Sequence, residues 1–187
     1  MIKLKNIPNL LTFSRLLLFP LWLLIFYLDY YYFLLIIIIY SALSDYFDGF
    51  LARKLNCETL IGKTLDPIAD KIFTCTVLLT FVSDSRVNFV IAAIIITREI
   101  VISGLRETLS IYNQSEVLAV TMLSKLKTAF QFLAIFILAL MPISLEYSLK
   151  IHQIGTLFLY ITAILAVYTG CNYAIKSINV INNIKKE

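Results

Sequence analysis

The stretch that decides the fold is residues 31–51, YYFLLIIIIYSALSDYFDGFL, a long apolar run with two aspartates near its end. A helix needs about 20 mostly apolar residues to cross the hydrocarbon core of a bilayer. This run has that length, so we predict that it forms a transmembrane helix.

Five further segments meet the same criterion of length and apolar character. They cover residues 9–28, 65–82, 87–109, 122–140 and 152–175. Residues 1–8 place Lys3 and Lys5 between apolar positions, which suits a short amphipathic segment on the membrane surface. We therefore predict an all-α integral membrane fold with six transmembrane helices, as a single domain over residues 1–187.

The composition of the whole chain agrees with this prediction. Hydrophobic residues make up 60% of the 187 residues and charged residues only 15%. A soluble domain of this size cannot bury so much apolar surface. The net charge of +4 is ordinary for a membrane protein with basic cytoplasmic loops, and we expect no nucleic-acid partner.

The distribution of lysine and arginine predicts the orientation, because cytoplasmic loops are enriched in both. An even number of spans puts both termini on one side. That side receives Lys3, Lys5, Arg53, Lys54, Lys63, Arg106, Lys125, Lys127, Lys176, Lys185 and Lys186. The other side receives only Arg86 and Lys150. We expect a multi-pass protein of the cell inner (cytoplasmic) membrane, with both termini in the cytoplasm.

Four aspartates stand at the cytoplasmic ends of the second and third predicted spans. Asp45 and Asp48 are three residues apart. Asp66 and Asp70 are four apart. Each pair therefore shares one face of its helix. Carboxylates gathered in one membrane pocket would repel one another unless divalent cations bind. A set of oxygen ligands without His or Cys favours Mg²⁺, with Mn²⁺ or Ca²⁺ as alternatives.

Small and basic residues accompany these acids. Gly49 and Ala52 let a ligand or another helix approach the backbone closely. Arg53 can hold a phosphate through two parallel hydrogen bonds. A single acid at a helix end is usually a solvated cap, but the whole combination within one short window favours a binding site.

A second, basic cluster lies in the fourth and fifth spans. Arg98 and Arg106 are eight residues apart and share a helix face. Lys125 and Lys127 open the next span. These four bases are candidates for binding the phosphate of a second, anionic substrate. Alternatively, the arginines pair with the glutamates that follow them and the lysines anchor helices at the membrane surface; spacing alone does not decide.

The acidic stretch resembles the signature of the CDP-alcohol phosphatidyltransferase family, D-x2-D-G-x2-A-R-x8-G-x3-D-x3-D. The matching positions are Asp45, Asp48, Gly49, Ala52, Arg53, Gly62, Asp66 and Asp70. Further similarity, to family members that use glycerol 3-phosphate, lies in residues 6–12 with Arg15, 65–71, 97–107 and 125–128. Gly104 stands where an alanine is expected.

The resemblance implies transfer of the phosphatidyl group from CDP-diacylglycerol to glycerol 3-phosphate, which gives phosphatidylglycerophosphate and CMP. It implies two metal ions, Mg²⁺ or Mn²⁺, held by Asp45, Asp48, Asp66 and Asp70. Asp70 would also be the general base toward the acceptor hydroxyl. The residues implied for CDP-diacylglycerol binding are Asn9, Gly49, Ala52, Arg53 and Thr59. Those implied for the acceptor phosphate are Arg98, Arg106, Lys125 and Lys127. A homodimer among membrane lipids, with its active site facing the cytoplasm, is also implied.

Two alternatives stay open. Another acceptor, such as serine, inositol phosphate or phosphatidylglycerol, would keep the same chemistry, although the basic cluster disfavours serine. A divalent-cation transporter would need a polar pathway across the whole bilayer, whereas all four aspartates lie toward one face.

Overall fold

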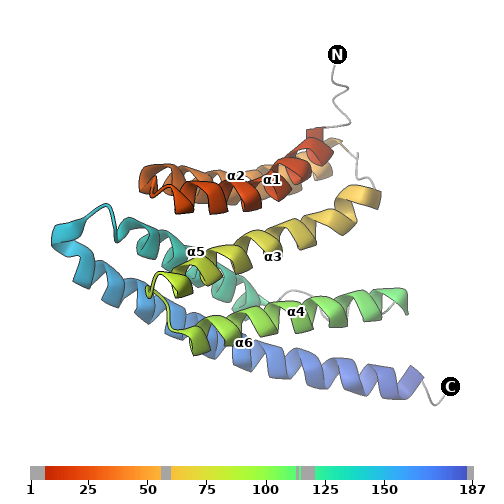
Figure 1. Ribbon diagram of the computed structural model, residues 1–187. Coiled ribbons are helices and arrows are strands. Elements are labelled where there is room, and N and C mark those ends of the chain that lie inside the picture. Colours follow the sequence, from red (N-terminus) through yellow and green to blue (C-terminus); the bar gives the residue numbers. More distant parts are fainter. Residues whose placement is uncertain (1–6, 56–59, 113, 115–120, 185–187) are drawn as a thin grey trace.

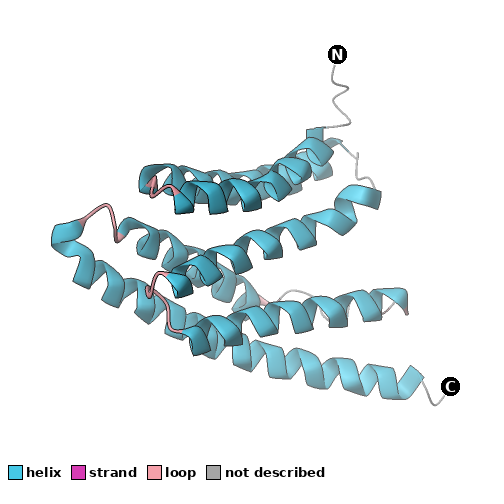
Figure 2. Cartoon of the chain, in the orientation of Figure 1, coloured by secondary structure: helices cyan, strands magenta, loops and turns pink. Residues whose placement is uncertain are grey.

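The computed structural model describes residues 7–55, 60–112, 114 and 121–184 (Figure 1). Within these ranges the chain consists of helices joined by loops, and no strand is present (Figure 2). The helices are α1 (Ile7–Tyr27), α2 (Tyr31–Leu55), α3 (Leu60–Ser83), α4 (Phe89–Ile111), α5 (Met122–Leu140), the short 3-10 helix η3 (Leu145–Tyr147) and α6 (Ser148–Ile184). The prediction of an all-α fold is therefore confirmed for the described residues.

Each predicted span coincides with the greater part of one long helix. The agreement is closest for α5, whose bounds are those predicted from the sequence. It is loosest for α6, which extends beyond both ends of the predicted segment 152–175. The predicted surface segment, residues 1–8, lies mostly outside the described residues, and its last two residues belong to α1.

Tight polar turns separate α1 from α2 and α3 from α4. Asp29 and Ser85 each adopt a left-handed backbone with φ of 57°, a conformation that ends a helix and turns the chain. Asn88 then caps α4, because its side-chain oxygen accepts a hydrogen bond from the Val90 amide at 2.8 Å. Short connections make neighbouring helices antiparallel, and the start of α1 and the end of α6 lie at the same end of the bundle (Figure 1).

The main hydrophobic core gathers around Trp22 of α1. Its buried indole ring meets the ring of Phe73 edge-on, with 5.8 Å between the centroids. The indole N–H donates a hydrogen bond to the Thr80 hydroxyl at 3.0 Å, which satisfies the one polar atom of the side chain. The same cluster extends to the other long helices through Leu34, Ile95, Leu138 and Leu159.

A second, smaller core lies further along α4 and α6, where Ile102 and Leu109 pack with Tyr173. Along α4, Ile95 belongs to the main core and Ile102 to the second one. The residues between them include Arg98 and Glu99, so a charged layer separates the two apolar cores.

A buried arginine, Arg86, lies in the α3–α4 turn, at the end of the bundle opposite to the start of α1 and the end of α6. Arg86 pairs with Asp84, and its carbonyl oxygen lies 3.1 Å from Nε2 of His152 on α6. Its guanidinium also lies against the rings of Phe26, Tyr31 and Phe81. These local partners give Arg86 a structural role that joins three parts of the chain.

Large apolar side chains cover much of the outer surface, among them Leu17, Ile36, Leu79 and Ile164, each more than half exposed. Within the described residues two helical segments, Met122–Leu140 and Ser148–Asn182, are long and apolar enough to cross a membrane. Shorter apolar helical segments run over Ser14–Tyr27, Tyr31–Ser44 and Lys71–Ser83. Such a surface is costly in water and suits a hydrocarbon surrounding.

Candidate active site

The predicted metal ligands lie on two helices, as their spacing requires. Asp45 and Asp48 are within α2, close to its end at Leu55. Asp66 and Asp70 are within α3, close to its start at Leu60. Unbroken helix across each pair keeps its two members on one helix face, which fits paired carboxylates that share a metal ion. The side chains themselves lie outside the described part of the structure, so their gathering around metal stays a prediction.

The side chains implied for CDP-diacylglycerol binding also lie outside the described part of the structure. Thr59 lies outside the described residues, as do the side chains of Asn9, Ala52 and Arg53 and the surroundings of Gly49. Among the described residues no group of three or more His, Cys, Asp or Glu side chains is placed to hold a metal ion.

The basic cluster, by contrast, is described in detail, and its centre is a glutamate. Glu99 of α4 forms an ion pair with Lys127 of α5. One guanidinium nitrogen of Arg98 lies 3.5 Å from the same carboxylate oxygen, and another donates a hydrogen bond to the Thr169 hydroxyl on α6 at 3.0 Å. Lys127 is 2% exposed, whereas Arg98 and Glu99 are partly buried, so one carboxylate compensates part of the charge of two bases in a largely buried cluster.

Tyr173 of α6 joins this cluster to Arg106. The guanidinium carbons of Arg98 and Arg106 each lie 6.0 Å from the centroid of its ring, which is within the range of a cation–π interaction. The Tyr173 hydroxyl lies 3.0 Å from the Ser124 hydroxyl and accepts a hydrogen bond from the Thr121 amide at 3.1 Å. The buried Tyr173 side chain therefore connects α6 to α4 and to the start of α5.

Three of the four predicted bases thus converge, and the fourth does not. Arg98 and Lys127 meet at Glu99, and Arg106 reaches the group through Tyr173. Lys125 is exposed on α5, and two residues along a helix change the face by about 200°. Within the described residues Arg98 does pair with the neighbouring Glu99, as the ion-pair interpretation expected, but that carboxylate also binds Lys127 from another helix.

A small polar pocket lies beside the cluster, between α3, α4 and α5. Its volume is about 70 Å³, and its lining consists of Lys71, Thr74, Glu99, Lys127, Thr128, Gln131 and Phe132. Lys71 follows Asp70 directly in the chain. The pocket therefore links the helix of the predicted general base to the predicted phosphate-binding residues.

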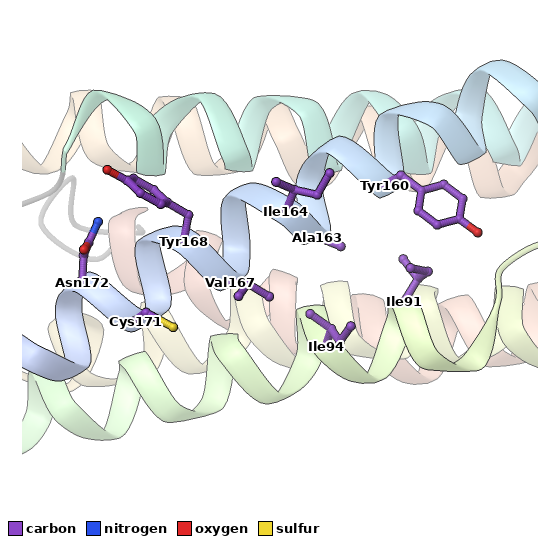
Figure 3. Close-up of a pocket in the computed structure, with 9 residues that line it drawn as sticks. All are labelled: Ile91, Ile94, Tyr160, Ala163, Ile164, Val167, Tyr168, Cys171 and Asn172. Carbon is purple, nitrogen blue, oxygen red and sulfur yellow. The ribbon is translucent and has the colours of Figure 1, made fainter.

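Larger cavities run along the contact between α4 and α6, and their linings are almost entirely apolar. One has a volume of about 600 Å³, with Ile91 and Ile94 of α4 facing Ala163 and Val167 of α6 (Figure 3). A second, of about 540 Å³, reaches Arg98 at its polar end. These grooves suit hydrocarbon chains, whereas the small pocket offers the polar groups that a hydrophilic reactant needs.

Two residues of this region, Tyr173 and Gln131, were not predicted as site residues. Gln131 lies in α5 and Tyr173 in α6, and the sequence of both helices indicates only apolar spans. A tyrosine or glutamine within such a span is the sequence feature that could identify them as site candidates, because polar side chains inside a membrane helix usually face a partner or a cavity.

Comparison with known proteins identifies the same family that the signature residues resemble. The profile of the family described as CDP-alcohol phosphatidyltransferase matches residues 5–168. A relative from Wigglesworthia glossinidia brevipalpis is 40% identical over 173 residues, 90% of this chain and 92% of that protein. Relatives from Rickettsia typhi and Pectobacterium atrosepticum are 34% and 37% identical over 174 residues, 90% of this chain and 95% and 92% of theirs.

All three relatives carry the name CDP-diacylglycerol–glycerol-3-phosphate 3-phosphatidyltransferase. The family profile spans most of the chain, and the relatives align over nearly their whole length. The chain belongs to the CDP-alcohol phosphatidyltransferase family.

Proposed function

We propose that this protein transfers the phosphatidyl group of CDP-diacylglycerol to glycerol 3-phosphate and releases CMP. The observation that carries the proposal is the match over 90% of the chain to relatives named for this reaction, at 34% to 40% identity. The basic cluster supports a phosphorylated acceptor, because serine would leave its charge uncompensated.

The reaction is a displacement at phosphorus. The 1-hydroxyl oxygen of glycerol 3-phosphate attacks the phosphorus that carries diacylglycerol, and the bond from that phosphorus to the CMP oxygen breaks. Asp70 takes the proton of the attacking hydroxyl as general base, and CMP leaves with the electron pair of the broken bond. Positioning and charge compensation account for the chemistry without a covalent enzyme intermediate.

The residues expected to hold two Mg²⁺ or Mn²⁺ ions are Asp45, Asp48, Asp66 and Asp70. When bound, the ions would compensate the negative charge of the pyrophosphate and of the departing CMP. The nucleotide end of CDP-diacylglycerol would contact Asn9, Gly49, Ala52, Arg53 and Thr59.

The acceptor phosphate is assigned to Arg98, Arg106 and Lys127, with Lys125 contributing from the exposed side of α5. The Nε atom of Arg98 supports this assignment, because it is buried and has no hydrogen-bond partner in the described part of the chain. A buried guanidinium N–H needs an acceptor, and a phosphate oxygen is the acceptor that arginine binds best.

The membrane arrangement follows from the substrates. CDP-diacylglycerol keeps its acyl chains in the bilayer, and the apolar grooves between α4 and α6 offer a surface for such chains. Glycerol 3-phosphate is small, charged and soluble. We therefore propose six transmembrane helices in the inner membrane, both termini in the cytoplasm and a site open to the cytoplasm, in a homodimer.

The decisive experiment measures CMP release by the purified protein in mixed micelles with CDP-diacylglycerol and one labelled acceptor at a time. We expect turnover with glycerol 3-phosphate and at most traces with inositol phosphate or serine. Turnover with inositol phosphate but not with glycerol 3-phosphate would show that inositol phosphate is the acceptor. Cation flux through liposomes without any CMP release would overturn the assignment as an enzyme.

A further inference from the structure

Gln131 of α5 is a buried amide with an unused hydrogen-bonding atom. The side chain is 3% exposed, and its Oε1 has no hydrogen-bond partner in the described part of the chain. Buried polar atoms are nearly always paired in folded proteins. The exceptions call for a specific explanation, such as a ligand that supplies the partner.

The surroundings of this amide favour a ligand. Gln131 lines the small pocket between α3, α4 and α5, together with Lys71, Thr74, Glu99 and Thr128 among others. The volume of about 70 Å³ accommodates a hydroxyl-bearing fragment or a few waters, but not a nucleotide. The pocket is therefore suited to one polar part of a small substrate.

The position of the pocket identifies that part. The lining includes Lys71 of α3, the neighbour in sequence of Asp70, which is the proposed base for the acceptor 1-hydroxyl. It also includes Lys127 of α5, which is assigned to the acceptor phosphate. In glycerol 3-phosphate the carbon between the reacting end and the phosphate-bearing end carries the 2-hydroxyl.

We infer that this pocket is the polyol subsite of the acceptor and that Gln131 Oε1 accepts a hydrogen bond from the 2-hydroxyl of glycerol 3-phosphate. The inference rests on the proposed function and adds a residue that selects the acceptor. Gln131 is neutral, so it adds nothing to the attraction of phosphate by the basic cluster. Its effect is on discrimination, because an acceptor without that hydroxyl leaves the buried oxygen unpaired.

The test compares two acceptors in the same enzyme preparation. The analogue 3-hydroxypropyl phosphate keeps the attacking primary hydroxyl and the phosphate and lacks only the 2-hydroxyl. We expect the wild-type kcat/KM to favour glycerol 3-phosphate by at least about tenfold. Gln131→Met keeps the length of the side chain without its amide. In this variant the ratio should fall to within about threefold, mainly through lower kcat/KM for glycerol 3-phosphate.

The ratio of the two acceptors does not depend on the fraction of folded enzyme, so a partly unstable variant still gives an answer. Gln131→Leu provides a second variant of different shape. Gln153→Met, an exposed glutamine on α6, is the matched control and should keep the wild-type ratio.

A wild-type enzyme that uses both acceptors equally, or variants at Gln131 that keep the full preference, would overturn the inference and leave the proposed function intact. A wild-type enzyme that cannot use glycerol 3-phosphate would overturn both.

Discussion

The ammonium group of Lys127 on α5 pairs with the carboxylate of Glu99 on α4, and both side chains are largely removed from the surface. The same carboxylate lies beside Arg98. Glu99 therefore keeps two bases at a fixed separation that would otherwise repel each other, and it does so next to the proposed acceptor site. We regard Glu99 as a positioning residue for the acceptor phosphate.

Replacing Glu99 should weaken acceptor binding. Glu99→Gln keeps the shape of the side chain but removes the charge that holds Lys127 and Arg98. Without this carboxylate the two neighbouring bases lose the partner that holds them at their present separation. We expect the KM for glycerol 3-phosphate to rise at least about tenfold, whereas the KM for CDP-diacylglycerol stays within about twofold. Steady-state kinetics with each substrate varied in turn measures both.

Glu107→Gln is the control for this change, because Glu107 is an exposed glutamate further along the same helix. Glu99→Asp should restore part of the acceptor affinity. Equal increases in both KM values, or an unchanged KM for glycerol 3-phosphate, would contradict a positioning role.

Tyr173 allows its ring and its hydroxyl to be tested separately. Tyr173→Leu removes the ring that Arg98 and Arg106 face. Since one cation–π contact contributes about 0.5–1 kcal/mol, the KM for glycerol 3-phosphate should rise by roughly fivefold. Tyr173→Phe keeps the ring but loses the hydrogen bonds to Thr121 and Ser124. It should lower stability by about 1 kcal/mol with little change in KM.

Thermal unfolding in detergent and acceptor titration distinguish these two effects. The exposed Tyr168 on the same helix offers a matched control, since Tyr168→Leu should alter neither quantity. If Tyr173→Phe and Tyr173→Leu raise the KM equally, the ring has no separate role.

The two lysines at the start of α5 should differ strongly in their contribution to binding glycerol 3-phosphate. Lys127 is buried in the cluster whereas Lys125 is exposed, and an exposed charge in water contributes little to a specific contact. We expect Lys127→Met to raise the KM for glycerol 3-phosphate at least about thirtyfold, as for a buried charged contact, and Lys125→Met about threefold or less. Acceptor titrations at low and moderate salt provide the comparison. A larger effect at Lys125 would place the phosphate on the outer side of α5.

Asp70→Asn should remove the proposed base while it keeps the shape of the side chain. General-base catalysis typically contributes about 10²–10⁴-fold, and metal binding would suffer as well, so we expect kcat to fall by at least about 10³-fold. Asp29→Asn, in the turn between α1 and α2, is the control at the opposite end of the bundle. Turnover near the wild-type level in Asp70→Asn would exclude Asp70 as the base.

Chelation tests the assignment of the four aspartates to metal. Treatment with EDTA should abolish CMP release, and added Mg²⁺ or Mn²⁺ should restore it, because a site made only of oxygen ligands prefers hard cations. In Asp48→Asn the Mg²⁺ concentration needed for half-maximal activity should rise. Full activity in EDTA would refute a metal-dependent reaction.

The sequence by itself determined where the long helices lie and what chemistry to expect. An apolar run of bilayer length has few alternatives to a helix, because a backbone in hydrocarbon must satisfy its own hydrogen bonds. The spacing of Asp45, Asp48, Asp66 and Asp70 is a local property of two helices, so it could be recognised along the chain. The resemblance of the signature to a known family followed from the same residues.

Only the tertiary structure decided how the basic residues are grouped. Glu99 meets Lys127 across two helices, Tyr173 reaches from α6 to both arginines, and Gln131 faces a pocket formed by three helices. Spacing also predicted the same role for Lys125 and Lys127, although Lys125 is exposed and Lys127 is buried. The physical reason is that such contacts depend on which helix faces pack together, and the periodicity of one helix carries no information about the face that its neighbour presents.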